Sequence, residues 1–302
     1  EFPELQGSMG ENYAMLKKEE AVVCRGIREH YYPRNAKDFL PEDAESVPAA
    51  IADKLDLLTT AFSLNMIPSG AADPYALRRT AQGITQLILG LRLPLDLHEL
   101  ISAAVRLLDD QQDLALDRTK LQNDLLDFLL QRQRWFLQER GIRYDLIDAV
   151  LKTSAGIQSA QGKTARSVLA IEQLSFAEFL GEHLETDMFK RSVEAIVRAA
   201  NISSKYAGRI AEELNESALE LKEEKAFLAA LQPILNSDSQ ALWSPDNYLQ
   251  QLRKIEPVVT RFFEDVMVMD EDPVKCGNRL WLCQQLAQWS GRHLDLQSIV
   301  FA

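Results

Sequence analysis

Residues 51–62 read IADKLDLLTTAF, and this stretch decides the fold. Its large apolar residues Ile51, Leu55, Leu58 and Phe62 recur at steps of four, three and four. Such steps place all four side chains on one face of a helix. The stretch therefore predicts an amphipathic α-helix that buries one face against a neighbour.

Working outward, the same periodicity appears in five further segments. They are Leu77, Ile84, Leu87, Ile88 and Leu91; Leu121, Leu125, Phe128 and Trp135; Leu214, Ala218, Leu221, Leu228 and Leu231; Val259, Phe262, Phe263 and Val266; and Leu280, Cys283 and Ala287. No stretch alternates apolar and polar residues as a half-buried strand does, and no strand–helix–strand rhythm is present. The sequence predicts an all-α protein.

Helix-breaking residues separate these segments. The main breakers are Pro68-Ser69-Gly70, Asp73-Pro74, Pro94, Gly141 and Ser244-Pro245-Asp246. Asp73-Pro74 is typical of an N-cap followed by proline at the first helical position. The breakers favour three helical regions, at residues 1–93, 94–180 and 181–302.

The composition fits a protein with a substantial core and no membrane span. The 302 residues are 46% hydrophobic, and no apolar run approaches the roughly 20 residues that cross a bilayer. The chain opens Glu1-Phe2-Pro3-Glu4 without an initiator Met or a signal pattern, so we expect a fragment of a longer protein. Three scattered cysteines are too few for a disulfide framework and favour a reducing cytoplasm.

The net charge of −12 argues against a broadly basic nucleic-acid binder. Affinity for a polyanion comes mainly from Lys and Arg that neutralise phosphates. Net charge does not, however, exclude a localised site. Any RNA binding by this chain therefore requires local clusters of basic residues.

One glycine-rich segment imitates a phosphate-binding loop. In Gly156–Thr164, five residues separate the glycines where the motif has four, and the preceding segment is helix-like where the motif needs a strand. We interpret this segment as a loop between helices.

Neither metal sites nor nucleophilic sites are predicted. The four histidines are far apart, and none is paired with Cys or another His at a ligand spacing. Cys276 and Cys283 lie seven residues apart on one helix face and are predicted to be small core residues. The sequence thus assigns no catalytic residue and no metal ligand.

One constellation resembles the back half of an HD-type helical domain, in which His and Asp side chains converge on a metal. It consists of His30-Tyr31, Pro33-Arg34 and Ala52-Asp53-Lys54-Leu55, with Asp53 at the position of the last ligand. The helices that carry the other ligands would lie before Glu1, so His30 and Asp53 are interpreted as vestigial. The alternative role for Asp53 is a surface carboxylate that pairs with Lys54 or caps a neighbouring helix.

A longer ordered series covers residues 1–79. It comprises Glu1-Phe2-Pro3-Glu4-Leu5-Gln6-Gly7, Met9-Gly10, Tyr13-Ala14, Glu29-His30-Tyr31, Pro33-Arg34, Ala36, Asp38, Leu40-Pro41, Ala52-Asp53-Lys54-Leu55-Asp56, Pro68-Ser69-Gly70 and Asp73-Pro74-Tyr75-Ala76-Leu77-Arg78-Arg79. This series resembles the HD-like domain of bacterial glycyl-tRNA synthetase beta subunits. Ser69 and Tyr75 depart from the family, which usually has Thr and Phe at these positions.

The C-terminal segment resembles the end of the anticodon-binding domain of the same family. It carries Phe262-Phe263, Val266-Met267-Val268-Met269, Asn278-Arg279-Leu280 and Asp295-Leu296. The Arg that the family has before Asn278 is shifted or lost. The three regions are therefore interpreted as a partial HD-like domain, a helical middle region and a C-terminal helical anticodon-binding-type domain.

The resemblance implies a heterotetramer of two alpha and two beta chains in the cytoplasm. The alpha subunit would use ATP and Mg²⁺ to make glycyl-adenylate, and the beta subunit would bind the glycine tRNA. This chain would be part of a ligase, the glycine–tRNA ligase, without the bond-making residues, and it would hold no cofactor itself.

Basic side chains near aromatics are the candidates for RNA contact. They are Arg34, Arg78, Arg79, Lys190, Arg191, Arg198, Lys205, Arg209, Arg261 and Arg279. Arg78 and Arg79 lie beside the start of a helix predicted at Pro74, where backbone N–H groups favour phosphate. Each candidate has an alternative role as a solvated or salt-bridged surface residue. For Arg279 the alternative is a salt bridge to an acidic residue of the loop at 270–272.

Two other functions stay open at this point. One is a remnant of an HD-type metal-dependent phosphohydrolase, supported by His30 and Asp53. The other is a helical scaffold that binds only protein, suggested by the acidity and by the many amphipathic helices.

Overall fold

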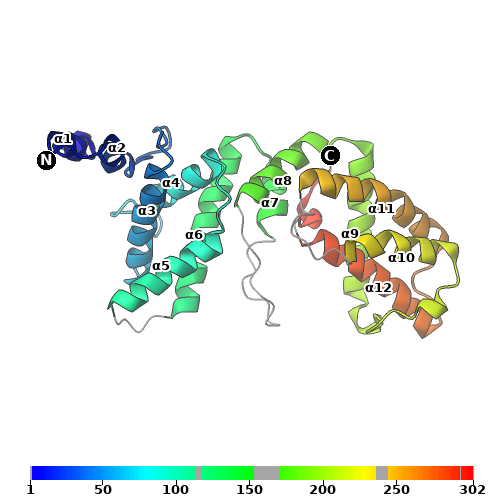
Figure 1. Cartoon of the computed structure of the whole chain (residues 1–302). Coiled ribbons are helices and arrows are strands. Elements are labelled where there is room, and N and C mark those ends of the chain that lie inside the picture. Colours follow the sequence, from blue (N-terminus) through cyan, green and yellow to red (C-terminus); the bar gives the residue numbers. More distant parts are fainter. Residues whose placement is uncertain (1, 113–116, 153–169, 236–243, 293, 302) are drawn as a thin grey trace. The chain divides into compact units, whose positions relative to one another are not determined.

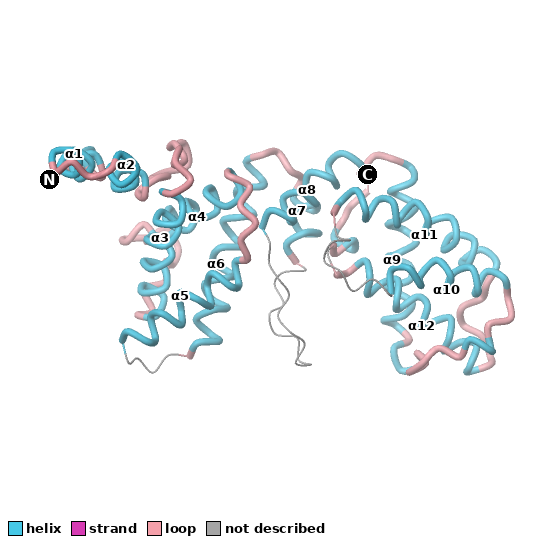
Figure 2. Tube along the Cα trace, in the orientation of Figure 1, coloured by secondary structure: helices cyan, strands magenta, loops and turns pink. Residues whose placement is uncertain are grey.

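The computed structural model describes residues 2–112, 117–152, 170–235, 244–292 and 294–301. Within these ranges every regular element is a helix, and the only strand-like pairing is an isolated bridge at the 69–72 turn (Figure 2). The all-α prediction is confirmed. None of the helices in the described ranges is long and apolar enough to cross a membrane.

The described residues form two compact units (Figure 1). The first contains residues up to 141 together with 170–174, and the second contains 142–152 and the residues from 175 onward. The first unit holds α1 (Ser8–Leu16), α2 (Ala21–Glu29), α3 (Ser46–Ser63), α4 (Leu77–Gly90), α5 (Leu97–Gln112) and α6 (Arg118–Glu139). The second holds α7 (Tyr144–Leu151), most of α8 (Ala170–His183), α9 (Asp187–Lys205), α10 (Lys222–Leu235), α11 (Pro245–Asp265) and α12 (Pro273–Ser290).

Helix α3 is the centre of the first unit and packs against α2, α4, α5 and α6. All four apolar residues of its predicted stripe are buried, as the sequence indicated. The Phe62 ring meets Phe128 of α6 edge-on, with centroids 5.0 Å apart. Trp135 does not complete the α6 stripe as predicted: it is 37% exposed, although it lies two helical turns after the buried Phe128 on the same face of α6.

Helix α4 begins at Leu77 and not at Pro74 as the sequence suggested. The reason is Ala76, which adopts a left-handed conformation with φ 55° and interrupts the helical backbone. Asp73 still caps the helix, because its carboxylate accepts hydrogen bonds from the N–H groups of Leu77 (2.8 Å) and Arg78 (3.0 Å). The positive end of α4 is therefore already occupied by a carboxylate.

In the second unit α9 packs against α11 and α12, and α10 packs against the same two helices. A buried aromatic cluster supports this packing. Tyr248 stacks on Trp289 at 5.1 Å, and its hydroxyl lies 2.9 Å from the Ser290 hydroxyl. Cys276 and Cys283 are buried in α12, as predicted for small core residues.

The helix predicted across residues 214–231 is wrong in its first half. Only a single 3-10 turn, Glu216–Ala218, precedes the start of α10 at Lys222. Asn278 explains the difference, since its side-chain amide accepts from the Asn215 N–H (3.0 Å) and donates to the Asn215 carbonyl (2.8 Å). A side chain that satisfies both backbone groups replaces the helical hydrogen bonds that Asn215 would otherwise make.

A buried lysine fastens the irregular segment after α2 to the first unit. Lys54 of α3 is 6% exposed, and its Nζ donates to the His30 carbonyl at 3.0 Å. Gly83 of α4 makes room for it, because a Cβ there would lie 3.0 Å from Lys54 Cε and 3.2 Å from the Pro33 carbonyl oxygen. Burial lowers the pKa of Lys54 from 10.5 to about 8, against the opposing influence of Asp53 and Asp38.

Replacing Lys54 with Met removes this buried charge and keeps a long side chain. The unfolded chain, with the ordinary pKa of 10.5, binds more proton than the folded chain at any pH between about 8 and 10.5. The unfolding free energy of the wild type, measured relative to Lys54→Met, should therefore rise with pH across that window, by on the order of 2–3 kcal/mol. Urea denaturation across this range measures it. The exposed Lys37→Met is the control and should show no such slope, and a flat difference for Lys54→Met would contradict the burial argument.

Candidate nucleic-acid interface

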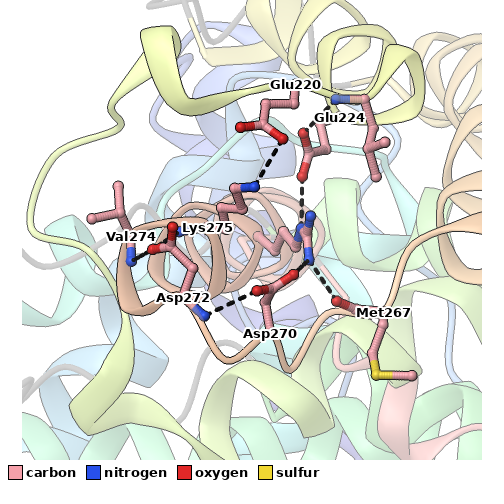
Figure 3. Close-up of polar contacts among 9 residues, drawn as sticks. Glu220, Glu224, Met267, Asp270, Asp272, Val274 and Lys275 are labelled. Carbon is pink, nitrogen blue, oxygen red and sulfur yellow. Dashed lines mark hydrogen bonds and ion pairs between the residues drawn. The ribbon is translucent and has the colours of Figure 1, made fainter.

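The Arg279 guanidinium lies in the interior of the second unit and not at its surface. The residue is 4% exposed, and its Nε donates to Glu224 Oε1 at 2.6 Å (Figure 3). Its Nη1 donates to the Met267 carbonyl (2.8 Å) and to Asp270 Oδ2 (2.7 Å). The ion pair with the 270–272 loop, given as its alternative role, is therefore present, and Arg279 as an RNA contact is not supported by this burial.

The first turn of α10 and the loop before α12 meet at this buried charge (Figure 3). On one side Glu224 uses its second oxygen to accept the N–H of Leu221, at the start of α10 (2.9 Å). On the other, Asp270 accepts the N–H of Asp272, and Asp272 in turn caps α12 by accepting from Val274 at 2.8 Å. The hydrogen bonds from Asp272 and Arg279 hold the pKa of the Asp270 carboxyl below its ordinary value. Arg279 thus fixes the starts of both helices.

A basic stripe runs along α9. Arg191, Arg198 and Lys205 recur at steps of seven, so they share one helix face, and all three are exposed. Arg209 follows in the next turn and is also exposed. We call these four residues the α9 stripe.

The neighbouring helix α11 shapes the first half of the stripe. Arg191 forms an ion pair with Glu256 at 2.9 Å, and the Arg198 guanidinium lies 4.5 Å from the Phe263 ring centre. The Lys205 ammonium lies 5.3 Å from the Tyr206 ring centre. A ring contact holds a cation in place without neutralising its charge. Arg198 and Lys205 therefore remain available to an anion, whereas Arg191 is partly neutralised.

The other basic residues of this unit differ in availability. Lys190 pairs with the exposed Glu185 at 3.0 Å. Arg261 is exposed and makes no hydrogen bond or ion pair with the described residues, and the same holds for Arg253 and Lys254 on the same helix. The sequence reasoning missed Arg253 and Lys254, because they lie outside the phrases that resemble a known family.

The candidates of the first unit are mostly engaged by their own loops. Arg34 binds Asp38 through Nε at 2.7 Å and through Nη2 at 3.2 Å, and this contact lowers the pKa of Asp38. Arg78 donates to the Gly70 carbonyl at 2.7 Å. Arg79 is exposed and has no such partner among the described residues.

Arg132 of α6 is a cation that the sequence reasoning did not single out. It lies 3.9 Å from the centre of the Phe128 ring and donates to the Phe128 carbonyl at 3.0 Å. Burial lowers its pKa, and the nearby positive charge of Arg78 lowers it further. Two guanidinium groups from different helices thus approach one another. The only sequence signal was the concentration of arginines between 131 and 140.

The residues interpreted as an HD remnant do not form a site. His30 is half-buried with Nδ1 3.2 Å from the Gly26 carbonyl oxygen, whereas Asp53 is exposed on α3. Lys54, and not Asp53, connects α3 to the backbone of His30. Among the described residues no group of three or more His, Cys, Asp or Glu side chains could hold a metal ion. The glycine-rich segment at 156–164 lies outside the described residues.

Replacing Arg279 with Met should lower the unfolding free energy by about 3–5 kcal/mol, because Glu224 then stays buried without a partner. In the double variant Arg279→Met/Glu224→Met, the loss of unfolding free energy should be clearly smaller than the sum of the losses in the single variants Arg279→Met and Glu224→Met. Lys275→Met is the matched control, since it breaks the more exposed pair with Glu220 and should leave the unfolding free energy close to that of the wild type. Urea denaturation of the four variants and the wild type measures these differences. Additive losses would show that Arg279 and Glu224 are not coupled.

Two family models match the chain. The model of the glycyl-tRNA synthetase beta subunit matches residues 1–152, and that of the DALR anticodon binding domain matches residues 193–297. The glycine–tRNA ligase beta subunit of Halalkalibacterium halodurans is 36% identical over 100% of this chain and 42% of its own length. Those of Halothermothrix orenii and Streptococcus pyogenes are 35% and 36% identical, over 99% and 95% of this chain and 41% and 38% of their own lengths.

The chain spans about two fifths of the length of the curated relatives that it matches. The first family model covers half of the chain, and the second covers α9 from Val193 through α12. The resemblance inferred from the N-terminal and C-terminal phrases is thereby confirmed. The chain belongs to the glycyl-tRNA synthetase beta subunit family.

Proposed function

We propose that this chain is the tRNA-binding portion of the beta subunit of a glycine–tRNA ligase, and that its C-terminal unit recognises the anticodon loop of the glycine tRNA. The observation that carries the proposal is the match of the anticodon binding domain to residues 193–297. That segment contains three members of the α9 stripe, namely Arg198, Lys205 and Arg209.

The geometry of the α9 stripe suits an unstacked RNA loop. At 1.5 Å per residue, the 14 residue steps from Arg191 to Lys205 extend over roughly 21 Å, which is enough to follow several nucleotides. Cations supply phosphate contacts, and planar groups such as guanidinium and aromatic rings stack on splayed bases. Arg198, held against Phe263, combines both properties. We therefore place Arg198 at the centre of the interface, with Arg261 as a further candidate on the neighbouring helix.

For the first unit, we propose contacts to the acceptor side of the tRNA. Arg79 is exposed and unpaired, and Arg78 and Arg132 bring two positive charges together near the turn at Gly70. The Asp73 carboxylate occupies the start of α4, so phosphate would bind through these side chains and not through the helix end. Arg34, already paired with Asp38, is the weaker candidate.

The acidic background should limit affinity. The chain carries a net charge of −12, and Glu194 stands between Arg191 and Arg198 on α9. Few phosphates are then neutralised, so the non-specific affinity should be modest, and it should fall with salt in proportion to the number of phosphates contacted. Discrimination must come from contacts to the bases.

The partners follow from the family. We propose that an alpha subunit, in a tetramer of two alpha and two beta chains, supplies the site where ATP, Mg²⁺ and glycine react. This chain would contribute RNA binding and no cofactor. We also propose a cytoplasmic location, which the three unpaired, buried cysteines support.

The first test concerns RNA discrimination. The chain is expected to bind a glycine tRNA transcript more tightly than the same transcript with an exchanged anticodon. Arg198→Gln should reduce this discrimination by about 1–3 kcal/mol if the guanidinium stacks on a base, and Arg198→Lys should restore the salt dependence but not the discrimination. Fluorescence anisotropy at low and high salt measures both quantities.

Arg292→Gln is the matched control, because Arg292 is an exposed cation of the same unit outside the α9 stripe. It should leave discrimination unchanged. If the wild type does not distinguish the two transcripts, the anticodon role is refuted. If only Arg198→Gln behaves like the wild type, the role stands and that residue does not contact a base.

A second test concerns catalysis. The purified chain should show no glycine-dependent exchange between ATP and pyrophosphate, because the proposal assigns that chemistry to the alpha subunit. The control is the same assay after addition of an alpha subunit. Exchange above background in preparations free of alpha chain would contradict the assignment.

A further inference from the structure

A hydrophobic groove lies in the first unit between α3 and α5. Its volume is about 720 Å³, and its walls come from α3, α5 and the two loops at 41–44 and 91–95. Small side chains create the hollow, namely Ala52 on α3 and Ala103 and Ala104 on α5. Leu107, on the rim, is 59% exposed.

The charge around this groove has one sign. Of its lining residues only Glu42 and Asp56 are ionisable, and both are exposed. Neither makes a hydrogen bond or an ion pair with the described residues. Within the described part of the chain, no Lys or Arg lines the groove. An occupant with apolar side chains and positive charges beside them would complement this surface, whereas an acidic occupant would be repelled.

The dimensions favour a short helix over a small molecule. The α3 wall from Val47 to Asp56 rises roughly 13 Å, which corresponds to two to three turns of a helix lying alongside it. Small-molecule sites usually add a few converging polar groups that orient the ligand. Apart from Glu42 and Asp56 the described lining residues are all apolar, and a hydrophobic groove of this kind suits an amphipathic helix that lays its apolar face into it.

We propose that this groove binds an amphipathic helix of another polypeptide, one that inserts an apolar face and carries Lys or Arg beside it. Its apolar side chains contact Leu55, Leu100 and Leu107, and its cations lie near Glu42 and Asp56. The groove lies apart from the α9 stripe in sequence and in fold unit, so this role is independent of anticodon recognition.

A synthetic helical peptide tests the proposal. The probe is about 16 residues long, with leucines at steps of four, three and four and lysines on the flanks of that face. Binding to the whole chain is measured by fluorescence anisotropy. The comparison peptides are a scrambled sequence of the same composition and a version with Glu in place of Lys. Only the first peptide should bind well, with both others weaker by about tenfold or more.

Variants of the chain locate the binding. Leu107→Glu should lower the affinity of the chain for the peptide by about tenfold, because it places a charge at the apolar rim. Leu57→Glu is the matched control. Leu57 is 45% exposed on α3 but does not line the groove, so this variant should bind the peptide with the affinity of the wild type. Glu42→Gln with Asp56→Asn should weaken binding about threefold at low salt and leave it unchanged at high salt.

Four results would overturn the proposal. They are no binding of the basic amphipathic peptide, equal binding of the scrambled or acidic peptide, equal effects of Leu107→Glu and Leu57→Glu, and self-association of the chain that Leu107→Glu abolishes. The last result would identify a second copy of the chain as the occupant.

Discussion

The C-terminal unit depends on one buried guanidinium. A charge in the interior is tolerated only when it is paired and hydrogen-bonded, and Arg279 meets this condition through Nε and Nη1, which donate to Glu224, Asp270 and a backbone carbonyl. These partners come from the first turn of α10 and from the loop that precedes α12. Because an unpaired charge would be so unfavourable there, both segments are held in one conformation. The position of α10 and α12 against α9 and α11, and hence the surface that presents the α9 stripe, follows from this constraint.

The same principle divides the basic residues of this acidic chain into two groups. Arg279 and Arg34 are paired with acidic side chains of the protein itself, which stabilises loops and makes both guanidinium groups less available to a polyanion. Arg198 and Lys205 are instead steadied by aromatic rings, which leave the charge uncompensated. An acidic RNA-binding protein needs this separation, since its few available cations must be placed where the RNA lies.

In the first unit, the HD-like segment Ala52-Asp53-Lys54-Leu55 has a structural role. Lys54 stands next to Asp53, the position that matches a metal ligand, and it points inward to bind the His30 carbonyl while Asp53 faces solvent. In this way the lysine fastens the segment after α2 to α3, beside Gly83 of α4. Next to it, the α3–α5 groove leaves an apolar surface with only negative charges around it.

The sequence by itself determined the fold class and the family. The apolar stripe from Ile51 to Phe62 is buried as its spacing required, because helical periodicity is a local property of the chain. Ordered phrases such as Asp73 to Arg79 were enough to identify the family, since they are read directly from residue identities. What only the tertiary structure decided was the state of each charge. Arg279 and Arg198 look alike in sequence. In the structure Arg279 is buried and paired with Glu224 and Asp270, which are 55 and 9 residues away along the chain, whereas Arg198 contacts the Phe263 ring, 65 residues away. The non-helical path through Asn215 likewise depends on Asn278, 63 residues later. Such contacts join residues distant along the chain, so no local pattern specifies them.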